Sequence, residues 1–110
     1  MKIFDMESLS ASEGGEYVLG TKDLHSHACY LIYGTLQAGE SERLVRPGEG
    51  HEEILCPIDG PIVMHTNQGD IRLEKSHAVH LTENESFFIS NPSDRPVVYI
   101  MAGGHSQPHH

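Results

Sequence analysis

A histidine and two glutamates stand at the head of an apolar segment, GHEEILCPIDG, at residues 50–60. Side chains two apart on a β-strand share a face, so His51 and Glu53 would point the same way. An imidazole beside a carboxylate can bind a transition metal or serve as an acid–base pair. The alternative is that His51 ends a loop in solvent. Glu53 would then be a buried carboxylate that needs a partner, such as Arg43, Arg46 or an interior histidine.

Histidine is abundant in this chain, with nine in 110 residues, and this density invites a metal hypothesis. His65 and His80 lie in strand-like runs, and both face solvent if their larger apolar neighbours face the interior. The pair His25 and His27 is expected on the surface. The remaining four are His77, which is expected in an exposed turn, and the C-terminal His105, His109 and His110, which would chelate nickel or zinc only weakly.

The charge balance limits the possible partners. The net charge is −9, from 16 acidic and 7 basic residues, so nothing here would neutralise nucleic-acid phosphates or an anionic membrane surface. The first ten residues, MKIFDMESLS, hold no apolar signal region, and no apolar run approaches the roughly 18 residues that span a bilayer. The prediction is a cytoplasmic protein without a membrane or nucleic-acid partner. Cys29 and Cys56 lie in apolar runs and are expected to be buried free thiols.

Short strand-like runs bounded by turn residues fill most of the chain, and residues 5–12 could hold one helical turn at most. The runs cover residues 16–20, 27–37, 42–45, 52–58, 61–66, 71–74, 78–81, 86–90 and 95–103. This spacing predicts an all-β sandwich or barrel of two packed antiparallel sheets. The chain is interpreted as one domain, residues 1–110, with its core at about 16–104 and a loose histidine-rich tail at 105–110.

Two motif fragments carry a family resemblance across roughly residues 28–104. Glu53 and Gly60 have the spacing of a glutamate and a glycine in the first motif of the cupin superfamily, which the chain resembles. The second cupin motif can be laid without a gap on Ser76, Thr82, Asn84, Phe87 and Asn91, where only Asn91 keeps its identity. The resemblance implies a cupin jelly-roll β-barrel, an interior pocket and a homodimer.

The chain departs from the family at its metal ligands. The paired histidines of the first motif would fall at residues 47 and 49, or 46 and 48, where the chain has Pro47 and Glu49, or Arg46 and Gly48. The histidine of the second motif falls at Phe87. Glu53 is therefore the only usual metal ligand that remains, and one carboxylate does not hold a catalytic metal ion.

Two functions follow as hypotheses. The first is a protein that binds a small organic ligand in its barrel without a metal cofactor, as a sensor, carrier, regulator or metal-independent isomerase. Its pocket residues would be Glu53, His51, Phe87, Arg46 and Leu55. The alternative is a divergent metal-dependent cupin enzyme, such as a dioxygenase, decarboxylase or isomerase. Glu53 and His51 would then hold iron, manganese, nickel or zinc together with His80, His65 or Glu49.

Overall fold

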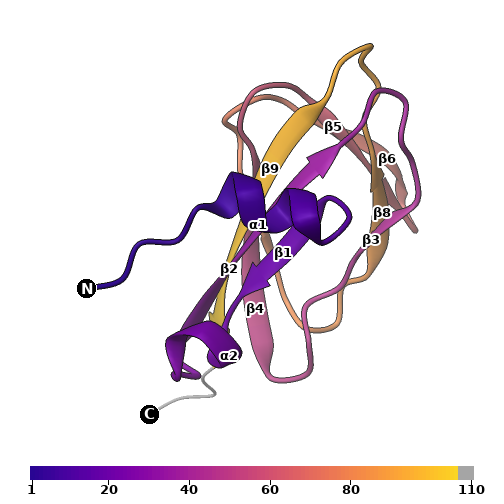
Figure 1. Ribbon diagram of the computed structural model, residues 1–110. Coiled ribbons are helices and arrows are strands. Elements are labelled where there is room, and N and C mark those ends of the chain that lie inside the picture. The colour runs from indigo at the N-terminus through magenta and orange to yellow at the C-terminus, as the bar shows by residue number, and fades with distance from the viewer. Residues whose placement is uncertain (107–110) are drawn as a thin grey trace.

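Nine strands form two antiparallel sheets that face each other in the computed structural model, which describes residues 1–106 (Figure 1). The five-stranded sheet has the order β1-β2-β9-β4-β7, and the four-stranded sheet has the order β3-β8-β5-β6. The strands are β1 (Glu16–Leu19), β2 (Cys29–Leu36), β3 (Arg43–Val45), β4 (His51–Pro57), β5 (Ile62–Thr66), β6 (Gly69–Leu73), β7 (Val79–Leu81), β8 (Phe87–Ser90) and β9 (Val97–His105). Each overlaps one predicted run, and the jelly-roll fold class is confirmed.

The two helices lie against β1 (Figure 1). Helix α1 (Met6–Ser12) is longer than the single turn that the sequence predicted, because the side chain of Asp5 caps it by accepting a hydrogen bond of 3.1 Å from the backbone N–H of Ser8. Helix α2 (Thr21–Leu24) was not predicted, and it ends at His25, whose φ of 55° is left-handed. Among residues 1–106, no helix is long and apolar enough to cross a bilayer.

The core lies between the sheets, where alternate residues of most strands point inward. Asn91, the motif residue that keeps its identity, follows β8 and is hydrogen-bonded to the end of β2. Its side-chain amide donates to the backbone carbonyls of Leu36 and Gln37, at 3.1 Å each, and to that of Arg95 at 2.7 Å. Asn91 is 2% exposed, so these bonds satisfy a buried amide, and its role is structural.

Two expectations about single residues were wrong. Cys29 is exposed and Cys56 is half-buried, although both are free thiols as expected. Cys29 on β2 and Cys56 on β4 both point outward from the five-stranded sheet, so their apolar neighbours do not cover them. His105 lies in β9 rather than in a loose tail, and the next residue, Ser106, donates its N–H to the carbonyl of Gly50 at 2.8 Å. Residues 107–110 of the predicted tail lie outside the described residues.

Candidate functional site

Strand β4 places its odd-numbered side chains inside the barrel. Glu53 is only 5% exposed, whereas the next residue, Ile54, is 49% exposed on the outer face. His51, two residues before Glu53, lies on the same inner side and is half-buried near the open end of the barrel. The apolar run after Glu53 therefore buries a carboxylate, and this side chain needs a partner.

The partner is a tyrosine two strands away. Tyr30 on β2 is in register with Gly103 on β9, and Gly103 is in register with Glu53 on β4. A Cβ on Gly103 would overlap the ring of Tyr30, so only glycine lets this ring cross β9. The Tyr30 hydroxyl donates to Oε2 of Glu53 at 2.6 Å. We call this arrangement of Tyr30, Gly103 and Glu53 the mouth rung.

The second carboxylate oxygen of Glu53, Oε1, differs from Oε2 in its hydrogen bonding. Within residues 1–106, no group donates a hydrogen bond to Oε1. Every buried side-chain nitrogen or oxygen in this part of the chain has a hydrogen-bond partner, so Oε1 is not among the buried atoms. Oε1 must therefore reach open space. Burial, followed by the hydrogen bond and the charge of Glu53, raises the pKa of Tyr30 well above its ordinary value, so the phenol stays a donor.

Glu53 lines a cavity of about 320 Å³ at this end of the barrel, which we call the mouth cavity. Tyr30, His51 and Glu53 line it with polar groups, and Val18 and Ile32 line it with apolar ones. Ligand pockets span about 300–1,000 Å³, so this cavity has room for a small molecule. A mostly apolar wall with a few convergent polar groups is the usual construction of such a site.

Two further histidines lie at the rim beside His51. The rings of His51 and His105 have their centres 5.0 Å apart, and those of His27 and His105 are 6.5 Å apart. His51 also meets the ring of Tyr30 edge-on at 5.6 Å. Sequence reasoning placed His27 on an unrelated surface and His105 in a tail. It missed the cluster because strand pairing, not sequence distance, brings these residues together.

The five residues predicted to share a pocket are separated in the structure. Glu53 and His51 line the mouth cavity. Phe87 is 7% exposed and lines a different cavity of about 360 Å³, with Met64 and Leu81. Leu55 is fully buried in the core, one step deeper along β4 than Glu53. Arg46 is exposed, because Val45 before it takes the inward position.

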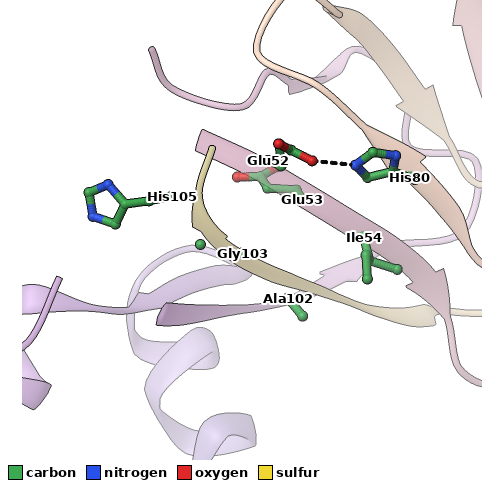
Figure 2. A pocket seen from close by; sticks show the side chains of 8 residues that line it. Glu52, Glu53, Ile54, His80, Ala102, Gly103 and His105 are labelled. Atoms are coloured by element: carbon green, nitrogen blue, oxygen red, sulfur yellow. Dashed lines mark hydrogen bonds and ion pairs between the residues drawn. The ribbon is translucent and has the colours of Figure 1, made fainter. Parts of the chain in front are cut away.

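Two of the three histidines of the metal hypothesis, His65 and His80, face outward, whereas His51 does not. His80 Nε2 lies 2.7 Å from Oε1 of Glu52, the contact that Figure 2 marks with a dashed line, and His105 points away from this pair. The hydrogen bond from His80 is the largest cause that lowers the pKa of Glu52 below its ordinary value. This pair borders a third hollow, of about 350 Å³, which Glu53 and His105 also line.

His65 also faces solvent, with its ring nitrogens 2.9 Å from Asp70 Oδ1 and 2.8 Å from Ser90 Oγ. The cause is alternation, because Met64 and Leu81, which adjoin the two histidines, take the inward positions. His65 and His80 therefore do not join Glu53 inside the barrel. Glu49 is exposed as well.

The motif positions do not fit the catalytic metal that the family resemblance implies. Phe87 turns an aromatic ring into the interior where the motif has an imidazole, and Glu53 already accepts from Tyr30. Within residues 1–106, no three histidine, cysteine, aspartate or glutamate side chains already converge as a metal-binding group. We derive no chemistry through a metal at these positions.

A second rung of the same kind lies at the other end of β2 and β9. Tyr99 on β9 is in register with Gly34 on β2, and Gly34 with Glu16 on β1. The Tyr99 hydroxyl donates to Glu16 Oε2 and accepts from Arg43 Nη1 at 3.0 Å. We call Tyr99, Gly34 and Glu16 the base rung.

The guanidinium of Arg43 is fully engaged at the base rung. Besides Tyr99, it contacts Oε2 of Glu40 at 2.6 Å and donates to the carbonyls of Gly15 and Thr35 at 3.3 and 3.2 Å. Arg43 was one of the partners that the sequence suggested for Glu53. The structure gives that role to Tyr30 instead.

Comparisons with known proteins bear on the fold. No family model matches the chain, and no curated protein matches it. Among solved structures, a cupin protein from Bacteroides fragilis has a TM-score of 0.73 at 16% identity, over 100% of this chain and 86% of that one. A predicted oxalate decarboxylase from Thermotoga maritima has a TM-score of 0.66 at 20% identity, covering 83% and 81%.

A third similar structure is the cupin domain of Cnp3 from Schizosaccharomyces pombe. Its TM-score is 0.62 at 14% identity, and the match covers 72% of this chain but only 57% of that one. Identities this low establish architecture and leave function open. The strand order, the two facing sheets and these structural neighbours together show that the chain has the fold of a small cupin.

Proposed function

We propose that the mouth cavity binds a small organic ligand that donates a hydrogen bond to Glu53. The observation that carries this proposal is the buried carboxylate with one oxygen held by Tyr30 and the other reaching open space. Burying a charge costs free energy, and no salt bridge to Glu53 forms within residues 1–106 to offset that cost. A ligand with an N–H or O–H donor would complete its hydrogen bonding.

The lining of the cavity limits the class of ligand. Glu53 accepts hydrogen bonds, His51 can donate or accept, and Val18 and Ile32 offer apolar contact. A small neutral or cationic molecule with a flat apolar part and at least one donor fits this set. An anion would meet both the carboxylate of Glu53 and the net charge of −9. The role would be that of a sensor, carrier, regulator or metal-independent isomerase.

The test is a fragment screen by ligand-observed NMR with the untagged full chain, in which hits are ranked by calorimetry. We expect Glu53→Gln to weaken the best hit at least about tenfold, because a charged acceptor is lost. Glu52→Gln is the matched control, since Glu52 is the next residue on β4 and faces outward. A hit that binds both variants equally would show that Glu53 is not the ligand's anchor.

The predicted homodimer is also a proposal, and the outer face of the five-stranded sheet supports it. This face carries Ile54 at 49% exposure, with Ala102 exposed beside it across the β4–β9 pair. A second copy packed on this face would cover both. Light scattering would give twice the chain mass for the wild type, and Ile54→Asp would give the single chain mass. A wild-type monomer at high concentration would contradict the proposal.

A further inference from the structure

Three imidazoles from separate segments meet at the rim of the barrel. His51 begins β4, His105 ends β9, and His27 lies in the segment between α2 and β2. His51 and His105 are register partners across β4 and β9, so the sheet itself fixes their spacing. His27 and His105 are exposed, and His51 is half-buried, so an ion from solvent can reach all three.

The spacing of His51 and His105 suits one metal ion between them. Ring nitrogens bind zinc at about 2.0–2.1 Å, which places the centres of two imidazoles on one ion about 4.5–5.2 Å apart at angles of about 90–110°. The observed distance of 5.0 Å between the two ring centres falls in this range. The 6.5 Å between His27 and His105 exceeds it, so His27 must turn inward to bind. As placed, no three histidine, cysteine, aspartate or glutamate side chains among residues 1–106 could hold a metal ion, so the site forms only once His27 has turned.

The rim histidines also differ from the outer ones in their hydrogen bonds. Within residues 1–106, the ring nitrogens of His51 and His105 have no hydrogen-bond partner, whereas His65 and His80 are each held by a carboxylate. His27 Nδ1 lies 3.4 Å from the hydroxyl of Thr21, which leaves Nε2 for an ion. A second oxygen partner of this kind orients ligating histidines in metal sites.

We propose that His51, His105 and His27 bind a first-row divalent transition metal ion, such as Zn²⁺ or Ni²⁺, at the rim of the mouth cavity. Three protein donors would leave at least one coordination position open. This site is distinct from the motif positions inside the barrel, because Glu53 is bonded to Tyr30 and contributes no ligand. It does not depend on the proposed ligand binding, since the histidines alone hold the ion.

The experiment is calorimetric titration of Zn²⁺ into the metal-free, untagged full chain near neutral pH. Every protein carries His109→Ala and His110→Ala, so that these two residues cannot supply the signal. We expect one ion per chain, and we expect His51→Ala and His105→Ala each to weaken it at least about tenfold, because one of three ligands is lost. His27→Ala should have a smaller effect. His65→Ala and His80→Ala are matched controls that should bind as before.

A second readout reports the ligands directly. Co²⁺ bound through several imidazoles has a visible absorption that hydrated Co²⁺ lacks, and we expect this signal to disappear in His105→Ala, an exposed position where the fold should be unaffected. Glu53→Gln should keep the zinc affinity, which separates the rim site from a site inside the barrel and from the proposed ligand binding. No zinc binding in the background protein, or equal binding in His105→Ala and His80→Ala, would overturn the proposal.

Discussion

The mouth rung and the base rung share the same arrangement of residues but differ in burial and in charge. In each, a tyrosine crosses a glycine on the neighbouring strand to reach a glutamate on the strand beyond. At the base rung, Tyr99 is fully buried and Arg43 supplies a positive charge. At the mouth rung, Tyr30 is half-buried, and no ion pair to Glu53 forms within residues 1–106.

The difference separates stability from binding. At the base rung, the phenol both donates to Glu16 and accepts from Arg43, so a cation lies within the same hydrogen-bond network as the carboxylate. The mouth rung leaves one carboxylate oxygen of Glu53 toward a cavity. We infer that the base rung stabilises the fold, and that the carboxylate of the mouth rung is available to the ligand proposed above.

The largest expected effect comes from adding a methyl group beneath each tyrosine. A Cβ at either glycine would overlap the tyrosine ring above it. Gly34→Ala should cost about 3 kcal/mol or more, because the ring of Tyr99 has no space to move into. Gly103→Ala should cost only about 1 kcal/mol, because Tyr30 can swing into the mouth cavity. Urea unfolding of both variants measures the difference, and equal losses would contradict the contrast between the rungs.

Removing each phenol should give the next largest effect. Tyr99→Phe leaves Arg43 and Glu16 each short of a partner, and we expect a loss of about 2 kcal/mol in the free energy of unfolding. Tyr30→Phe should cost less than about 1 kcal/mol, since water in the cavity can solvate Glu53. Chemical denaturation gives both values. A larger loss for Tyr30→Phe than for Tyr99→Phe would contradict this expectation, because the mouth rung would then be the structural one.

High pH should also separate the rungs. Burial, then the charge and the hydrogen bond of Glu16, raise the pKa of Tyr99 above the ordinary value near 10. The folded state therefore holds this proton more tightly than the unfolded state. The resulting stability is complete below about pH 10 and is lost as the pH rises toward the folded-state pKa.

We expect Tyr99→Phe to flatten this decline by up to about 1.4 kcal/mol per pH unit. Tyr30→Phe should flatten it less, because its phenol borders solvent. Urea midpoints measured from roughly pH 9 to pH 11 test both variants. An unchanged slope in Tyr99→Phe would mean that Tyr99 contributes nothing to the alkaline loss.

The smallest effect is expected on the outer face. Glu52 and His80 form an exposed pair, and such pairs contribute about 0–1 kcal/mol. His80→Ala should therefore change the free energy of unfolding by less than about 0.5 kcal/mol. Thermal unfolding of this variant beside Gly34→Ala sets the scale for the other effects. A loss near that of Tyr99→Phe would mean that this pair contributes far more than an exposed pair does, as it would if the proposed dimer covered it.

The strands were predictable because their signals are local. Turn pairs such as Asp59-Gly60 and runs of β-branched and aromatic residues mark each strand independently of the others. The burial of Glu53 was expected from the apolar residues that follow it. The helix at residues 6–12 was underestimated, because a single capping residue decides whether so short a segment is helical.

The rungs were not predicted, because each joins three strands that are distant in the chain. One sequence signal could have revealed them. Tyr30 and Gly34 on β2 have the same spacing as Tyr99 and Gly103 on β9, in YLIYG and YIMAG. When two such strands pair antiparallel in register, each tyrosine faces the other strand's glycine. The pairing partner and its register had to be known first, and the sequence did not supply them.

The most direct test compares the two glutamates. We would measure the free energy of unfolding of Glu53→Gln and Glu16→Gln against the wild type. Glutamine can still accept from Tyr30 while removing the buried charge, so Glu53→Gln should leave stability unchanged or raise it. Glu16→Gln should lower stability by about 1–2 kcal/mol, because the buried hydroxyl of Tyr99 loses its charged acceptor. A loss in Glu53→Gln as large as that in Glu16→Gln would contradict the account, since Glu53 would then be a structural residue.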